Sequence, residues 1–74
     1  MDAREWITEF AAEAGVSAPT DEEVEQLLAL AGVAAHASER TAAPISCWIA
    51  ARAGLSPAEG RALAVRLAEA AGEQ

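Results

Sequence analysis

The chain has no lysine, asparagine or tyrosine, and it has only one cysteine, one histidine and three aromatic residues. The single cysteine, Cys47, cannot form a disulfide within the chain, and one cysteine with one histidine gives no metal-ligand spacing. The longest uncharged run, Gln26–Ser38, spans 13 residues, fewer than the roughly 20 that a membrane-spanning helix needs. The N-terminus is acidic within five residues and is unlike a secretory signal. We therefore expect a cytoplasmic protein with no membrane partner and no metal or other cofactor.

Positive charge is also scarce, because five arginines face twelve acidic residues and leave a formal net charge of −7. This charge argues against nucleic acid as a main partner, since nucleic acid is itself negative. A length of 74 residues allows one domain, residues 1–74, but leaves little chain for an enclosed catalytic pocket. Cys47 and His36 lack a third group that would orient the histidine for nucleophilic catalysis. We therefore expect no enzyme activity from this chain.

Alanine is abundant, with 21 residues, and it favours helix because it loses no side-chain entropy there. Capping signals divide the chain into four helices, at about residues 2–14, 20–38, 44–53 and 57–71. The start signals are Asp2 with Glu5, Thr20 with Glu23, Pro44, and Ser56-Pro57 with Glu59; the stop signals are Gly15, Gly54 and Gly72. No strand alternation is visible, so the sequence predicts an all-α fold, either a compact four-helix bundle or an orthogonal array.

Apolar residues at helical spacing form one stripe on each predicted helix, and we expect these stripes to build the core. The helix at 20–38 is apolar nearly all round in its second half, which is typical of a central helix. The predicted core residues are Trp6, Phe10, Leu27, Leu28, Ile45, Trp48, Ile49, Leu63 and Leu67. Because the chain has only 18 larger hydrophobic residues, a homodimer or docking onto a larger protein would add to a modest stability.

One polar cluster has the spacing of an anion site. His36 and Arg40 are four residues apart, so we expect them on the same side of the second helix near its end. The predicted third helix begins shortly afterwards with unpaired N–H groups. If the loop folds back, His36, Arg40, Thr41 and Ser46 would surround a phosphate or carboxylate. The alternative is structural: His36 bonds a backbone carbonyl and Arg40 neutralises the C-terminal dipole of the preceding helix.

Residues 31–54 carry an Ala-His…Arg-x-Ala-Ala-Pro-Ile-Ser pattern, and a tryptophan-containing helix precedes it. In these features the chain resembles a small family of bacterial helical domains that occur alone or fused to molybdenum-cofactor guanylyltransferase, which joins GMP to molybdopterin. The matching positions are Trp6, His36, Arg40, Ala43, Pro44 and Ser46. The chain departs from the family pattern at Val33, where aspartate is usual, and at Thr41, where proline is frequent.

The resemblance implies an association with molybdopterin guanine dinucleotide biosynthesis. On this basis we expect an accessory protein-interaction module whose partner is the guanylyltransferase or a molybdoenzyme. The alternative is a small binder of an anionic, phosphate-bearing ligand at the junction of the second and third predicted helices. The chain has no Gly-rich phosphate loop and no metal-binding carboxylate cluster, so we do not expect it to be a nucleotidyltransferase itself.

Overall fold

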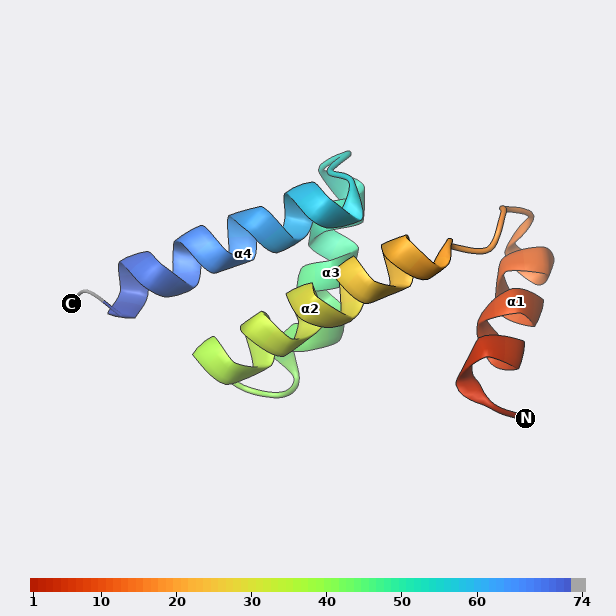
Figure 1. Cartoon of the computed structure of the whole chain (residues 1–74), viewed down its shortest axis with the longest axis horizontal. Helices are drawn as coiled ribbons and strands as arrows, with labels where there is room; N and C mark the ends of the chain where they lie inside the picture. Colours follow the sequence, from red (N-terminus) through yellow and green to blue (C-terminus); the bar gives the residue numbers. More distant parts are fainter. Residues whose placement is uncertain (73–74) are drawn as a thin grey trace.

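The computed structural model describes residues 1–72 and shows four helices joined by short loops (Figure 1). The helices are α1 (Ala3–Ala14), α2 (Asp21–Ala37), α3 (Ala42–Arg52) and α4 (Pro57–Gly72). No strand occurs in this described part of the chain. The prediction of an all-α fold with four helices is therefore confirmed, and the helix bounds differ from those predicted by at most two residues.

Three of the helices begin with a complete capping box, as their sequences predict. In α4, the Glu59 N–H donates to the Ser56 hydroxyl at 3.1 Å, and the Ser56 N–H donates to the Glu59 carboxylate at 2.8 Å. The same reciprocal pair joins Thr20 to Glu23 at α2 and Asp2 to Glu5 at α1. These bonds satisfy backbone donors that the helix itself leaves unpaired, which fixes where each helix starts.

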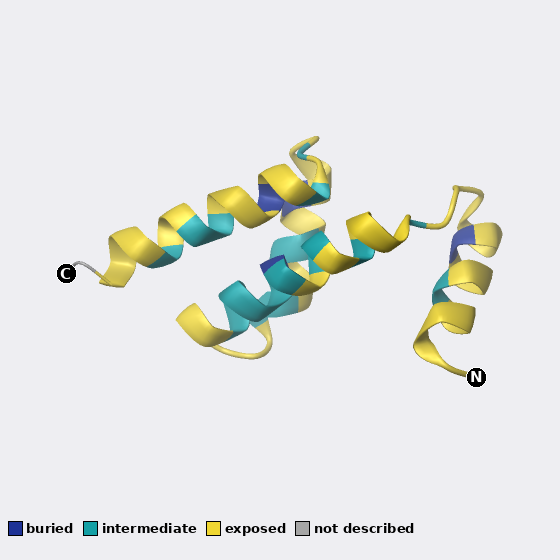
Figure 2. Cartoon of the chain, viewed as in Figure 1, coloured by how far each residue is buried: buried dark blue, intermediate teal, exposed yellow. Residues whose placement is uncertain are grey.

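The packed centre of the molecule is the place where α2, α3 and α4 meet. α2 packs against both α3 and α4, so the prediction that this helix is central is confirmed. Leu30 of α2 is only 3% exposed, and Ala50 of α3 and Gly60 of α4 are buried beside it (Figure 2). A Cβ atom at Gly60 would lie 3.1 Å from the Ala50 Cβ and 3.2 Å from a Leu30 methyl. Glycine at this position therefore lets α4 approach the other two helices closely.

Most of the predicted core residues are not buried in this structure. Leu27 is half-buried, whereas the other eight are exposed: Trp6, Phe10, Leu28, Ile45, Trp48, Ile49, Leu63 and Leu67. On α3 the inward face is built instead from small residues, including Ala43, Ser46 and Ala50, all of which are buried or half-buried. The prediction was wrong because small side chains allow close helix crossings, so the helices meet through alanine and glycine rather than through their large apolar stripes.

The first helix stands apart from the other three (Figure 1). α1 packs against no other described helix, and one exposed ion pair, Arg4 to Asp21 at 2.7 Å, ties it to the start of α2. Its C-terminus closes with Gly15 at φ 78°, and the Val16 N–H donates to the Ala11 carbonyl. This turn satisfies carbonyls that the end of the helix would otherwise leave unpaired. α1 is thus capped at both ends but lacks a packing partner within residues 1–72.

Candidate functional site

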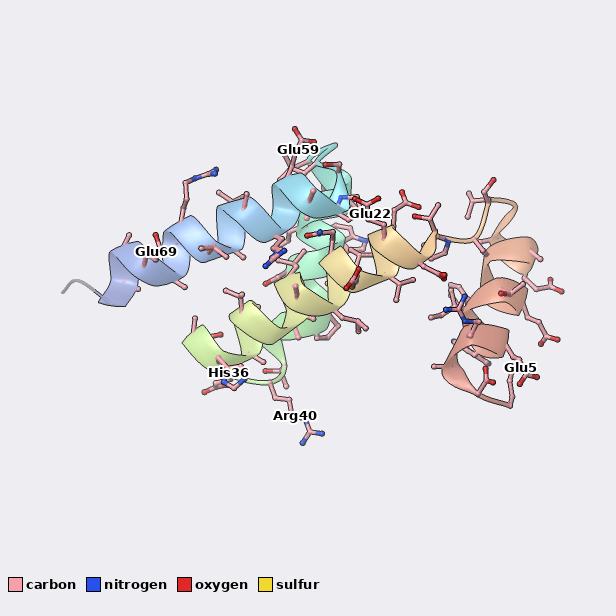
Figure 3. All side chains as sticks on the ribbon, viewed as in Figure 1. Glu5, Glu22, His36, Arg40, Glu59 and Glu69 are labelled. Atoms are coloured by element: carbon pink, nitrogen blue, oxygen red, sulfur yellow. The ribbon has the colours of Figure 1, made fainter. Side chains whose placement is uncertain are left out.

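The predicted anion-site residues lie around the loop that joins α2 to α3. His36 is in the last turn of α2, where it is exposed, and Arg40 is in the loop rather than on the helix (Figure 3). α2 ends at Ala37, where Ser38 leaves helical geometry with φ −140° and ψ −99°. The Ser38 hydroxyl and N–H both donate to the Ala34 carbonyl, at 2.8 and 3.2 Å. The prediction that Arg40 continues the helix face of His36 is therefore wrong.

The four predicted ligand-binding residues do not converge on one point. The Arg40 side chain extends away from the helices into solvent (Figure 3). Thr41 precedes α3 as its N-cap residue but makes no side-chain capping bond. Ser46 is half-buried and faces an apolar groove on the interior side of α3. The arrangement therefore offers no shared anion cradle. Among residues 1–72, no side-chain hydrogen bond or ion pair of His36 or Arg40 supports the structural alternative either.

The groove between α2, α3 and α4 is an apolar concavity beside the packed centre. It has a volume of about 430 Å³, and its walls come from the second half of α2, the inner face of α3 and the length of α4. Its larger side chains are Leu30, Val33, Ile49, Leu55, Leu63 and Leu67. Ser38 and Ser46 supply its only side-chain hydroxyls among the described residues. Such a lining suits apolar side chains of another helix rather than a charged ligand.

A second apolar surface lies on the outside of α3. Ile45 and Trp48 are each 59% exposed, and the Arg52 guanidinium lies 5.1 Å from the centroid of the Trp48 ring. Positions 45, 48 and 52 follow helical spacing, so these side chains form one stripe. We call Ile45, Trp48 and Arg52 the α3 outer stripe. The sequence does place these residues on one side of the helix, but it does not show that this side faces solvent.

A third apolar surface lies on α1. The rings of Trp6 and Phe10 are 5.9 Å apart and tilted by 37°, and they are 59% and 63% exposed. The two residues are one helical turn apart, which places their rings together. Ile7 and Ala11, on a neighbouring face, are better covered. The most amphipathic helix of the chain therefore turns its aromatic face to solvent.

The described residues offer little chemistry for catalysis. Burial raises the pKa of the Cys47 thiol, which disfavours the reactive thiolate. Among residues 1–72, no three His, Cys, Asp or Glu side chains are grouped so that they could hold a metal ion. None of the helices described there is long and apolar enough to cross a membrane. Among the described residues, the three apolar surfaces are the features best suited to binding another molecule.

Comparison with known proteins places the whole chain in one family. Residues 1–74 match the family described as a domain of unknown function, DUF6457, and the chain belongs to it. No curated protein and no solved structure matches the chain.

Proposed function

We propose that this member of DUF6457 is an accessory protein-interaction module that docks on a larger protein and performs no catalysis itself. The observation that carries the proposal is the α3 outer stripe, Ile45, Trp48 and Arg52. Exposed apolar patches of this kind mark interaction sites. Tryptophan and arginine are also the residues most enriched among those that dominate binding energy at protein interfaces.

The geometry of the stripe suits a protein partner. The Arg52 guanidinium already lies over the Trp48 ring, so the two side chains lose less freedom on binding than two independent side chains would. Ile45 adds apolar area one turn away. The stripe lies on a helix whose other face packs into the centre of the molecule, and this packing holds the surface in place.

We further propose that the partner belongs to molybdenum cofactor biosynthesis, with the guanylyltransferase as first candidate and a molybdoenzyme as second. The support is the sequence resemblance described above, in which similar domains occur alone or fused to the guanylyltransferase. A fusion keeps a module at high effective concentration beside its enzyme. A separate chain has to reach the same enzyme through a non-covalent surface.

The test is a binding titration of the full chain against each purified candidate from the same cell, followed by calorimetry. We expect saturable binding, and Trp48→Ser should weaken it about tenfold or more. Leu28→Ser is the matched control, because Leu28 is also an exposed apolar residue but lies on α2 outside the stripe and the groove. Failure of the wild-type chain to bind either candidate would refute the choice of partner. Equal loss in both variants would refute the choice of surface.

A further inference from the structure

The single chain exposes more surface than a folded protein of its mass should. Its accessible surface is 5724 Å² for a mass of 7.6 kDa, whereas the scaling for folded monomers gives about 4,300 Å². The excess is roughly 1,400 Å² per chain, or about 2,800 Å² for two chains, which falls in the range of permanent homodimer interfaces. The surface left uncovered is therefore the amount that a stable dimer buries.

Two of the uncovered surfaces are complementary. α1 has an exposed aromatic face and no packing partner, and the α2–α3–α4 groove has apolar walls and an open interior. The twelve residues of α1 give a length of about 18 Å. Along α4 the groove runs from Gly60 to Ala71, which is about 17 Å of helix. The α4 wall of the groove thus matches α1 in length.

The distribution of charge favours the same pairing. Residues 1–25 contain eight of the twelve acidic residues and one of the five arginines, which accounts for the whole net charge of −7. The remaining 49 residues have four of each and are neutral. α1 carries the acidic row Glu5, Glu9 and Glu13, whereas α4, one wall of the groove, balances exposed Arg61 and Arg66 with Glu59 and Glu69. Placing α1 in the groove of another copy therefore sets an acidic helix against a neutral part of the chain and avoids like-charge repulsion.

The connection between α1 and α2 is too short to let a chain place its own α1 along the whole of its own groove. Only Ser17, Ala18 and Pro19 lie between the turn that closes α1 and the N-cap of α2. If α1 folded back along its own α2, its twelve residues would cover about twelve residues of that helix, roughly residues 21–32. The α2 wall of the groove begins at Leu30 and ends at Ser38. A chain's own α1 would therefore overlap only the near end of its groove. The α1 of another copy is not tied to this α2 by the short connection and can lie along the whole groove.

We propose that the chain forms a homodimer in which α1 of each copy lies in the α2–α3–α4 groove of the other. Trp6 and Phe10 then pack against groove side chains such as Leu63 and Leu67. This inference uses α1 and the groove, whereas the proposed docking function uses the α3 outer stripe. The dimer proposal and the docking proposal can therefore fail independently of each other.

The first test is sedimentation velocity of the full chain over a dilution series. The wild type should sediment as a dimer, and a double change, Trp6→Ser with Phe10→Ser, should raise the dimer dissociation constant about 100-fold or more. Leu28→Ser, with an equally exposed leucine outside the groove, should leave the dimer unchanged. Since α1 packs on no helix of its own chain, the doubly changed protein should retain the helical signal of α2–α4.

The second test uses the wild type alone and does not depend on any variant folding. Isotope-labelled and unlabelled chains are mixed, and nuclear Overhauser contacts between the two kinds of chain are recorded. Contacts between the Trp6 ring of one chain and the Leu63 or Leu67 methyls of the other support the exchanged helix. The proposal is overturned by the same contacts within a single chain, by a monomer with no such contacts, or by a dimer joined through another surface.

Discussion

α1 and the packed unit of α2–α4 begin with the same kind of capping box but differ in their tertiary contacts. α1 and α4 both begin with a full capping box, yet α4 packs on α2 and α3 through Gly60 and α1 packs on none of them. Capping sets where a helix begins and ends, but most helical stability in proteins comes from tertiary packing. The sequence of α1 is thus sufficient to set the ends of the helix. The tertiary packing that would stabilise this helix has to come from a surface outside its own chain.

Shortening a leucine at the packed centre of α2–α4 should change stability more than any other substitution considered. Leu30→Ala removes the most buried side chain, at the point where three helices meet, and should lower the free energy of unfolding by about 3 kcal/mol. Leu28→Ala changes a leucine that is 69% exposed on the same helix, and it should cost about 0.5 kcal/mol. Urea unfolding followed by circular dichroism measures both. Similar losses in the two variants would show that the centre is not where the structure places it.

Gly60 tests the close approach of α4. Gly60→Leu forces a side chain into Ala50 and Leu30 and should destabilise the chain by about 2 kcal/mol. Gly32→Leu is the matched control, because a Cβ atom at Gly32 meets nothing within 4 Å. There the better helix propensity of leucine should stabilise the chain by up to about 0.8 kcal/mol. Thermal unfolding of both variants gives the comparison, and a tolerated Gly60→Leu would contradict the crossing described here.

Removing an N-cap side chain should affect α1 and the α2–α4 unit differently. In α1 the loss should stay local, whereas in α4 it should lower the stability of the whole packed unit. Ser56→Ala removes the N-cap of α4 and should lower global stability by about 1 kcal/mol, since α4 is part of the packed unit. Asp2→Ala removes the N-cap of α1, and in the single chain, under dilution, it should reduce helix content in α1 while leaving the unfolding of α2–α4 unchanged. Residue-resolved amide exchange separates these effects. A fall in protection throughout the chain after Asp2→Ala would indicate that α1 is coupled to the rest.

The smallest expected effect is on the pH dependence of stability. The bond from the Ser56 backbone N–H holds the pKa of the Glu59 carboxyl below its ordinary value of 4.5. Because the folded pKa is the lower one, this carboxylate stabilises the fold above pH 4.5, and the contribution disappears as the pH falls through the folded value. The stability difference between wild type and Glu59→Gln should therefore be present at neutral pH and vanish in acid. A stability difference that persists or grows once the Glu59 carboxyl is protonated would contradict this contribution of the carboxylate.

The sequence predicts the helices much better than it predicts their packing. Capping boxes and glycine stops are local, so Thr20 with Glu23, Ser56 with Glu59, and Gly15 could be recognised from spacing alone. The direction that each face takes is set by tertiary contacts. The aromatic stripes on α1 and α3 satisfy the usual rule for a core, yet alanine and glycine occupy the crossings. A glycine inside a strong helix pattern, Gly60, was the available signal for a close crossing.

The candidate site was predicted less well, for a similar reason. The spacing of His36 and Arg40 suggests a shared helix face, but that inference needs the helix to continue through residue 40. α2 ends at Ala37, and Ser38 has left helical geometry while its hydroxyl bonds back to the Ala34 carbonyl. Arg40 then leaves the helix and points into solvent. A side chain that competes for a backbone carbonyl is hard to recognise without the tertiary context.

The most direct test of the central claim is amide hydrogen exchange of the full chain, recorded under dilution where sedimentation gives a single chain. We expect strong protection around Leu30, Ala50 and Gly60 and weak protection throughout residues 3–14, because α1 has no packing partner in its own chain. Protection of α1 should then rise as the concentration increases and dimers form. Protection of α1 equal to that of the Leu30 region in the single chain would contradict the account.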